Sequence, residues 1–535
     1  MAVFGDDGTP IPYQLHHVFL ATFEKGTSMG YYLGVDIGTS GTKSLLIDDQ
    51  GRILAEASAG YDVLMPRPMW TEQDPDAWWE ATVKTIRAVV RKAKIPSGDI
   101  KAIGLSGQMH GSVFLDAKQQ VIRPAILWND QRTGEQCEEI TRRAGGRAKL
   151  IEMVANPALT GFTAPKLLWL RKHEPKHYDR LRHLLLPKDE IRRRLTGQLA
   201  TDASDASGML LLDVAKRQWS KPLLSKLEID PAILAPVFES EQVTGTLLPE
   251  VARTLGLSPL CKVVGGAGDC AAGAVGNGIV QQGILTASLG TSGVVFVHSD
   301  KPQTDSLGRL HTFCHAVHGK WHMMGVTLSA AGSLQWLVQQ VLQGGDEKQS
   351  RDLFKLLNKE ASLIPPGSEG LYFLPYLAGE RTPHANPKAR GCFIGLTNAH
   401  RRAHMARSVM EGVGYSLRES LSILQQMKIP VKEIRLSGGG AQSPLWKQML
   451  SDIFGQTTCT INAEQGPAFG VALLAAVGDG AYRSIEEACR ATIKVVEKIP
   501  ARKKEKSAYD ARFPIYQELY QALRSTFDAI DASES

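Results

Sequence analysis

The apolar and polar positions of this chain form two strand–turn–strand units of the same kind. Residues 31–47 and 284–298 each contain two short apolar runs separated by a turn of glycine, serine and threonine. The turns share one tetrad, Gly38-Thr39-Ser40-Gly41 and Gly290-Thr291-Ser292-Gly293. Apolar runs around so short a polar turn predict a β-hairpin, whereas a P-loop would lead from its strand into a helix. Since the tetrad recurs in the same context, we predict two domains related by duplication.

Strands and helices alternate in the rest of the pattern, which predicts an α/β fold. A third strand is expected at residues 53–57, and a helix begins at Pro75 behind the capping residue Asp74, with apolar residues at helical spacing as far as Val90. Two further apolar strands run into glycine-rich turns that precede helices, residues 263–264 before Gly265–Asp269 and residues 433–436 before Ser437–Ala441.

The length predicts more than one large domain, because 535 residues exceed what a single hydrophobic core usually serves. A regular pattern of apolar and polar positions begins only after Met29. The second hairpin follows an expected helix of small residues that ends near Gly276. We therefore divide the chain into an N-terminal extension (1–28), a first domain (29–282), a second domain (283–520) and a C-terminal tail (521–535).

The composition argues against several classes of protein. Hydrophobic residues make up 43% of the chain, charged residues 22%, and the net charge of +6 has no basic stripe with interleaved aromatics, so no nucleic-acid partner is expected. No apolar run approaches the ~20 residues that span a bilayer, so no membrane partner is expected. The seven cysteines form no C-x-x-C pair, which favours a reducing cytoplasm. His311, His315 and His318 have zinc-like spacing only in a helix, but they follow a loop and precede an expected strand at Trp321–Val326, and in extended structure His318 falls on the other face, so no metal is expected there.

The first hairpin is the best candidate for a phosphate site. Backbone N–H groups near Gly38 can approach a phosphate closely, and the hydroxyls of Thr39 and Ser40 can donate to its oxygens. Asp36, at the end of the strand, can hold Mg²⁺ directly or through water, and Lys43 adds positive charge. The alternative is a structural turn in which Asp36 is a hydrogen-bond acceptor.

Two other glycine turns could complete a nucleotide site. The second hairpin, with Gly290 and Thr291, would clamp a triphosphate from the opposite side of a cleft. The glycines at 438–440, including Gly439 and Gly440, would let the flat ring of an adenosine lie against backbone. One hairpin alone is weak evidence, and the pair is stronger. The turn at 438–440 is weak by itself, since strand–glycine–helix junctions are common in α/β proteins.

Asp269 is the candidate general base. It ends a glycine turn and starts a helix of small residues, so its carboxylate can be exposed in a cleft with little bulk around it. Phosphoryl transfer needs a positioned carboxylate to accept the proton of the attacking hydroxyl. The alternative is that Asp269 only caps the helix, and the two roles are compatible.

Taken in order, these residues resemble the FGGY carbohydrate kinase family, and its xylulokinase branch most closely. The resemblance runs from about Tyr31 to Gly478. Six stretches carry it: Gly34–Gly41, Ser106–Gly111 with Gln-Met-His-Gly, Pro124–Asp130, the first family signature Gly161–Trp169, Leu374–His384, and the second signature Gly391–Glu411. Gln-Met-His-Gly is the most specific of these for xylulokinases.

The resemblance implies a fold and a set of site residues. The fold would be two ribonuclease-H-like domains of the actin-like ATPase type, facing a deep cleft that binds ATP and Mg²⁺. Asp269 would be the general base and Asp36 the second catalytic carboxylate, near the metal. Sugar contacts would come from Met109 and His110, with Gln108, Trp128, Asp130 and Cys270 as weaker candidates. The nucleotide would be lined by Thr291, Gly332, Gly439, Gly440 and Ser443. By analogy with relatives, a homodimer is expected.

Cys270 departs from the family pattern and leaves the substrate open. Xylulokinases commonly carry Asn directly after the catalytic Asp, and a thiol is a weaker hydrogen-bonding group than an amide. We predict phosphorylation of D-xylulose to D-xylulose 5-phosphate, with D-ribulose, L-xylulose, 1-deoxy-xylulose or a pentitol as alternatives. Two rivals of other classes are an actin-like ATPase acting on protein partners and a non-catalytic sugar sensor.

Overall fold

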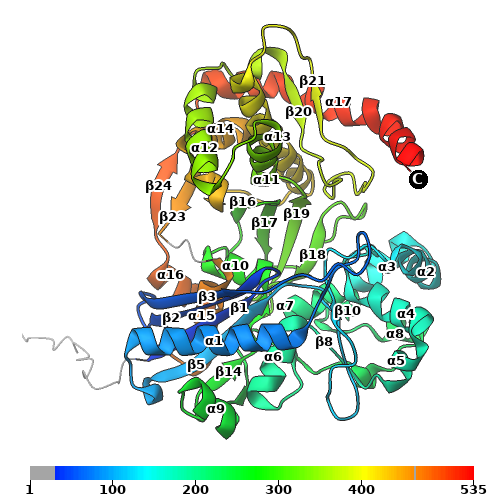
Figure 1. Ribbon diagram of the computed structural model, residues 1–535, viewed down its shortest axis with the longest axis vertical. Helices are drawn as coiled ribbons and strands as arrows, with labels where there is room; N and C mark the ends of the chain where they lie inside the picture. The colour runs from blue at the N-terminus through cyan, green and yellow to red at the C-terminus, as the bar shows by residue number, and fades with distance from the viewer. Residues whose placement is uncertain (1–29, 463–465, 535) are drawn as a thin grey trace, which may run out of the picture.

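Two seven-stranded mixed sheets organise the molecule, one in each half of the chain. The computed structural model describes residues 30–462 and 466–534, so the proposed extension 1–28 lies outside the described residues. The half that contains the second sheet stands on the half that contains the first (Figure 1). The mixed α/β fold class and the two hairpin patterns are confirmed.

The first sheet is built around the first hairpin. Its strands are β13 (Val243–Thr246), β14 (Lys262–Val264), β5 (Ile100–Gly107), β1 (Tyr31–Ile37), β2 (Gly41–Asp48) and β3 (Ile53–Gly60) in spatial order, with β15 (Ala267–Gly268) also paired to β5. β1 runs antiparallel to β2 and parallel to β5, and Gly38 N–H closes the turn on Gly41 O at 3.0 Å.

Side chains of β1 alternate between two helical layers. Leu33 and Val35 pack into the same core as Trp78 of α1 (Pro75–Ala93), whereas Tyr32 packs into the core of α15 (Gly466–Asp479). This alternation follows from the two-residue period of a strand and shows that both faces of the sheet are covered. The sequence prediction for α1 is confirmed: Asp74 is its N-cap and accepts a hydrogen bond from the N–H of Asp76.

The second sheet repeats the hairpin and extends it. In spatial order its strands are β18 (His311–Cys314), β19 (Trp321–Thr327), β17 (Gly293–Ser299), β16 (Ile284–Leu289), β22 (Glu433–Ser437), β23 (Thr458–Ile461) and β24 (Val495–Ile499). Its largest helices are α12 (Glu347–Ser362), α13 (Arg402–Gln426), α14 (Pro444–Phe454) and α17 (Lys503–Glu534). The strand expected at Trp321–Val326 is confirmed as β19, and His311 begins a further strand, β18. Among the described residues no cluster of side chains is suited to a metal ion.

A lobe of helices flanks the first sheet. It contains α2 (Gly134–Ala144), α3 (Arg147–Val154), α4 (Thr163–His173), α5 (Pro175–Arg180), α6 (Pro187–Thr196), α7 (Ala203–Ala206) and α8 (Lys221–Leu227), and α9 (Pro249–Leu255) follows before β14. The helix α10 (Asp269–Gly276) then leads into the second half. None of the helices within 30–462 and 466–534 is long and apolar enough to cross a membrane.

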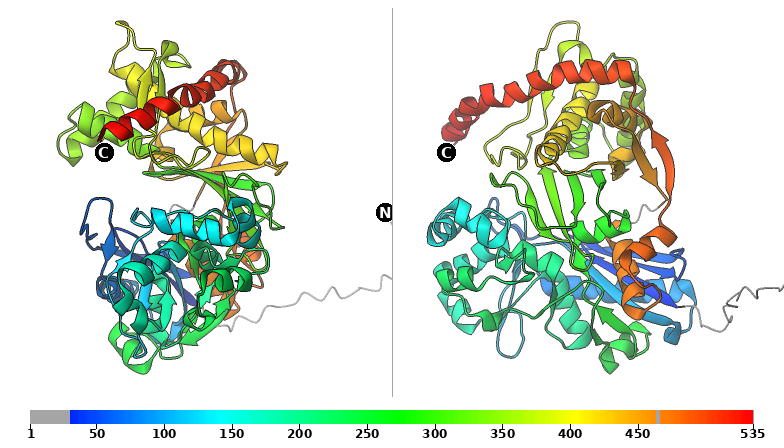
Figure 2. Two further views of the ribbon diagram at one scale, coloured as in Figure 1. Left: turned by 90° about the vertical axis from the view of Figure 1, so that its right-hand side faces the viewer. Right: turned by 180° about the vertical axis from the view of Figure 1, so that it is seen from behind.

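The chain crosses back to the first half near its end. α15 and α16 (Ile485–Thr492) pack with α10 and the first sheet, and the right-hand view of Figure 2 shows these orange helices against the blue strands. A Cβ atom on Gly34 would lie 1.9 Å from Ala468 O, so glycine permits this close approach. The division at residue 282 places α15 and α16 in the second domain, although they pack on the first sheet. The domain boundaries stay a prediction. Residues 521–534, set apart by sequence as a tail, continue α17.

Candidate active site

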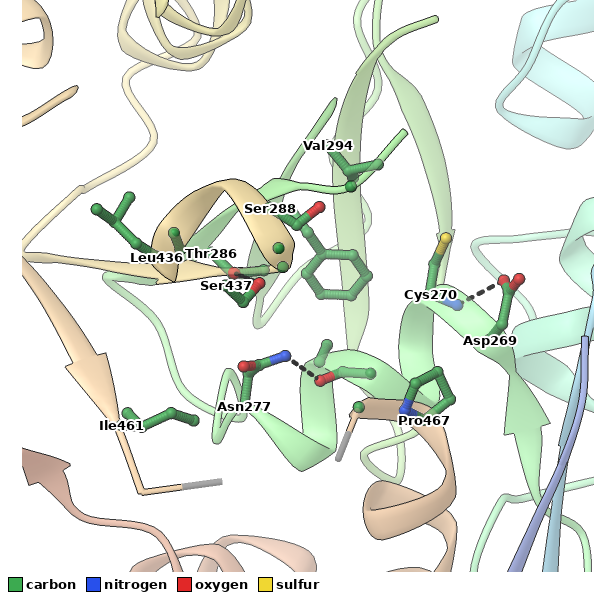
Figure 3. Close-up of a pocket in the computed structure, with 18 of the residues that line it drawn as sticks. Asp269, Cys270, Asn277, Thr286, Ser288, Val294, Leu436, Ser437, Ile461 and Pro467 are labelled. Carbon is green, nitrogen blue, oxygen red and sulfur yellow. Dashed lines mark hydrogen bonds between the residues drawn. The ribbon is translucent and has the colours of Figure 1, made fainter. Parts of the chain in front are cut away.

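A cavity of about 490 Å³ lies between α10 and the ends of β16 and β22. Asp269 and Cys270 lie on one side of it, and Ser288 and Ser437 lie on the other (Figure 3). Gly290, Gly438 and Gly439 also line it, as do Gly466 and Pro467 at the start of α15. The cavity is therefore formed by the two halves of the chain together.

Asp269 is positioned by the backbone around it. Gly266 has φ +66°, and a Cβ there would lie 2.0 Å from Leu105 O, so glycine is needed at this turn. Gly268 is the helix N-cap and Asp269 the first helical residue, which corrects the capping alternative. Its Oδ1 accepts the N–H of Cys270 at 2.7 Å. Burial raises the pKa of Asp269, and that hydrogen bond opposes the rise.

Asp36 faces the same end of the first sheet. It pairs across β1 and β5 with Ser106, which pairs with Ala267, two residues before Asp269. Its Oδ1 is buried and has no hydrogen-bond partner among the described residues. Burial, and then the charge of Asp269, raise the pKa of Asp36 to about 7. A buried carboxylate oxygen that has no hydrogen-bond partner among the described residues suits a cation, so the residue fits the Mg²⁺ role.

The rest of the first hairpin is tied to its own half of the chain. Thr39 Oγ1 donates to Gln108 Oε1 at 3.2 Å and accepts from Trp128 Nε1 at 2.9 Å. Lys43 Nζ lies 3.1 Å from Glu56, and Ser40 is exposed. Gly38 to Lys43 do not line the described cavity, so their roles toward phosphate stay predictions.

Two of the weaker sugar candidates are occupied by internal contacts. Gln108 is buried and its Nε2 donates to Gln73 Oε1 at 2.9 Å. Asp130 is fully buried, pairs with Arg132 at 2.8 Å and accepts the N–H of Thr71 at 2.7 Å. These contacts give both residues a positioning role around Trp128 and the hairpin.

His110 and Met109 lie beside the turn that carries Asp269. A Cβ on Gly268 would lie 2.8 Å from Met109 Cγ. His110 Nδ1 lies 2.7 Å from Gly208 O, and because a carbonyl only accepts, Nδ1 carries the proton. Burial lowers the pKa of His110 to about 3, so the ring is neutral and Nε2 is an acceptor. Such a nitrogen suits a sugar hydroxyl.

Some of the remaining nucleotide candidates line the cavity, and the others hold the turns and helices around it. Gly290 and Gly439 line the cavity. Thr291 O accepts the N–H of Gly332 at 3.2 Å, which joins the second hairpin to α11 (Ala331–Trp336). Gly440 lies beneath, where a Cβ would be 2.8 Å from Leu289 Cβ. Ser443 caps α14 by accepting the N–H of Trp446 at 3.1 Å.

Sequence reasoning did not single out Lys166, although it lies in the first signature stretch. Its Nζ donates to His110 O at 2.9 Å and to Gly161 O at 2.8 Å, and burial lowers its pKa to about 7. The signal in the sequence was a lysine in the otherwise apolar start of α4, where a buried amine needs partners. Lys166 thus holds the backbone of His110 in its left-handed conformation, with φ 68°.

Comparison with known proteins shows where the resemblance lies. Residues 31–276 match the N-terminal domain model, and residues 285–478 the C-terminal domain model, of the FGGY family of carbohydrate kinases. A xylulose kinase of Escherichia coli is 41% identical over 92% of this chain and 99% of its own length, and one of Bacillus subtilis is 38% identical over 92% and 97%. The crystal structure of a xyloylose kinase from Brucella ovis superposes with a TM-score of 0.85 at 36% identity, covering 93% of this chain and all of that one.

Proposed function

Since the chain belongs to the FGGY family of carbohydrate kinases, we propose that it transfers the γ-phosphoryl group of ATP to the 5-hydroxyl of D-xylulose. One observation carries the proposal: the carboxylate of Asp269 lines a cavity of about 490 Å³ whose opposite wall is made of glycine-rich backbone. A hydroxyl acceptor held at Asp269 would face phosphates held at that wall. The names of the similar proteins, xylulose kinases, supply the substrate class.

Asp269 would act as the general base. Its Oδ2 is free of the N–H of Cys270, which Oδ1 accepts, and it can receive the proton of the attacking hydroxyl. The raised pKa of Asp269 makes it a better proton acceptor than an ordinary carboxylate. ATP would lie with its phosphates along the turn of Gly290 and its base near Gly439, where backbone N–H groups can donate to phosphate oxygens.

Asp36 would hold Mg²⁺, because its buried Oδ1 has no partner among the described residues. The metal would neutralise charge on the phosphate oxygens. Bound cation would also keep Asp36 ionised despite the burial that raises its pKa.

The sugar would lie between Asp269 and the pair Met109 and His110. Nε2 of His110 accepts one hydroxyl, and Met109 supplies an apolar contact close to the catalytic turn. Cys270 offers a neutral thiol where relatives carry an amide, so the other ketopentoses and pentitols remain alternative substrates. The site thus supports a small polyol with one reacting primary hydroxyl.

A coupled ADP-release assay over D-xylulose, D-ribulose, L-xylulose, 1-deoxy-xylulose and pentitols tests the proposal, with the sugar phosphate identified by mass. Asp269→Asn should lower kcat by roughly 10²- to 10⁴-fold and leave calorimetric sugar binding intact. Asp76→Asn, at the exposed start of α1, is the matched control. ATP hydrolysis that no sugar stimulates would favour the actin-like ATPase, and sugar binding without turnover the sensor.

We infer a cytoplasmic location and a homodimer as further parts of the proposal. All seven cysteines lie in the described residues and are free thiols, which suits a reducing compartment. The homodimer rests on analogy with relatives alone. Fractionation of the source cells and light scattering of the purified protein test the two inferences separately.

A further inference from the structure

Arg381 reaches the sugar side of the site from the second half of the chain. It follows β20 (Tyr372–Leu374) in the segment Leu374–His384 and is partly buried. Its guanidinium makes no hydrogen bond or ion pair with any residue that the structure describes, although most arginines buried to this degree are paired. A guanidinium can donate hydrogen bonds but cannot accept them, so this one is available to donate to a bound ligand.

The guanidinium lies beside the residues assigned to the sugar. Its Nη2 lies 3.8 Å from the position that a Cβ on Gly161 would occupy, and Gly161 O shares the ammonium of Lys166 with His110 O. Burial first, and then the charges of Lys166 and Arg381, lower the pKa of His110. The same charge acts on the thiol of Cys270 and opposes the rise that burial causes in its pKa. Arg381 is therefore near both ends of the sugar site.

The segment that carries Arg381 is rigid. The carboxylate of Glu380 accepts the hydroxyl of Thr327 at 2.6 Å, the N–H of Leu328 at 3.2 Å, the N–H of Arg381 at 2.7 Å and the hydroxyl of Ser416 at 3.4 Å. Thr382 N–H donates to Val326 O at 2.9 Å, and Thr382 Oγ1 accepts the N–H of Val326 at 3.1 Å. These bonds tie both neighbours of Arg381 to β19, so its backbone is fixed before a sugar binds.

The other strong donors around the site are already used. Trp128 Nε1 donates to Thr39, Gln108 Nε2 to Gln73, and Lys166 Nζ to two carbonyls. Asp269 and Nε2 of His110 can only accept. A ketose differs from a pentitol by one oxygen, the carbonyl, that accepts hydrogen bonds and cannot donate. That oxygen needs a donor, and Arg381 is the charged one without an internal partner among the described residues.

We propose that Arg381 donates to the carbonyl oxygen of an open-chain ketose and so selects ketoses over the corresponding pentitols. The inference rests on the proposed function and deepens it. The thiol of Cys270 cannot replace this donor, because it is neutral and weak. His311, whose ring nitrogens also have no partner among the described residues, is the neutral competitor for the role.

The test compares Arg381→Met, Arg381→Lys and His311→Phe with wild type, after thermal melts confirm folding. The KM for D-xylulose and the inhibition constants of xylitol and D-arabinitol against it are measured. Arg381→Met should raise the KM for D-xylulose roughly 10- to 100-fold, change the pentitol constants less than threefold, and leave the KM for ATP within twofold. Arg381→Lys should recover part of the lost affinity for D-xylulose, because lysine keeps the positive charge but not the forked N–H groups of the guanidinium.

Arg390→Met, in the chain that follows this segment, is the matched control, since that residue lies toward Asp531 of α17. Equal loss of ketose and pentitol affinity in Arg381→Met, or no loss, would overturn the inference, as would a selective ketose loss in His311→Phe alone. Wild-type turnover is read separately: if wild type phosphorylates no sugar, the proposed function fails, and direct calorimetric binding of ketose and pentitol to wild type and Arg381→Met still decides the role of Arg381.

Discussion

The ammonium nitrogen of Lys188 lies 2.8 Å from Oδ1 of Asp202, and neither side chain is exposed to solvent. Lys188 also pairs with Asp189 at 2.7 Å and with Asp205 at 3.3 Å. Asp202 in turn accepts the hydroxyl of Ser204, whose Oγ accepts the N–H of Gly268 at 3.2 Å. The buried charges therefore support the turn that positions the catalytic carboxylate.

We expect Lys188→Met to lower the free energy of unfolding by about 3–5 kcal/mol, because the buried acidic groups Asp189, Asp202 and Asp205 lose their shared cation and only Asp189 keeps an ion pair, with Arg192, among the described residues. The measurement is urea unfolding at pH 7.5. Lys172→Met, which removes an exposed pair with Glu135, should leave the midpoint unchanged. An unaltered midpoint in Lys188→Met would show that the cluster is not needed for stability. If the variant folds, its kcat should fall as well, since the turn at Gly268 loses support.

Asp205→Asn, in the same buried cluster, should gain folding stability relative to wild type as the pH rises. Burial raises the pKa of Asp205 well above the usual range despite the opposing charge of Lys188, so folding favours the protonated form of this carboxyl. The unfolded chain releases that proton near pH 4, so folding stability falls as pH rises from there toward the folded pKa. Asparagine has no proton to hold.

The stability of Asp205→Asn relative to wild type should therefore increase with pH, by at most about 1.4 kcal/mol per unit. Urea unfolding of both proteins at intervals between pH 5 and 9 measures the difference. A constant difference across that range would mean that Asp205 is ionised in the folded state. The contact of Asp205 with Lys188 would then be that of a fully ionised carboxylate.

Local pattern was sufficient for the elements that frame the site. The hairpins β1–β2 and β16–β17 could be predicted because apolar runs bounded by glycine, serine and threonine specify both strands and turn. The position of the Asp269 carboxylate at a cavity followed from the same reasoning, since glycines on one side and small residues on the other leave space around it. These features depend on neighbours in sequence.

Features that depend on distant partners could not be predicted. The carboxylate of Asp130 accepts the N–H of Thr71 and pairs with Arg132, and nothing in the sequence spacing indicates these contacts. Arg381 enters the site of the first half from a segment attached to β19. α15 consists largely of small apolar residues, typical of any buried helix, and only the close approach to Gly34 shows which sheet it covers.

Gly34→Ala tests that close approach. A methyl group at position 34 would lie 1.9 Å from Ala468 O and 3.1 Å from Ala472 Cβ, and a backbone oxygen cannot move away by a rotamer change. We expect a loss of about 3 kcal/mol or more, at the upper end for overpacked cores. Gly98→Ala is the control, because nothing lies within 4 Å of its added methyl group. Equal melting temperatures for the two variants would show that α15 does not contact β1 as described.

Cys270→Asn tests the departure from the family pattern at the residue next to the catalytic base. Burial, and then the charge of Asp269, raise the pKa of the Cys270 thiol well above its usual range, so it is neutral and a poor hydrogen-bonding group. The side chain lines the cavity, so an amide can be accommodated without overpacking a core. Gaining one hydrogen bond to a sugar hydroxyl should raise kcat/KM for D-xylulose about 3- to 10-fold.

Cys270→Ser separates the amide from polarity alone, because its hydroxyl is too short to reach where the amide would, and it should leave kcat/KM within about twofold. The comparison across ketopentoses decides what the cysteine does. A gain confined to D-xylulose means that the thiol tunes the preference among ketopentoses, since the lost contact belongs to one sugar configuration. A loss for every sugar in Cys270→Asn would instead mean that the space beside Asp269 is filled by substrate, and that the smaller side chain is what admits it.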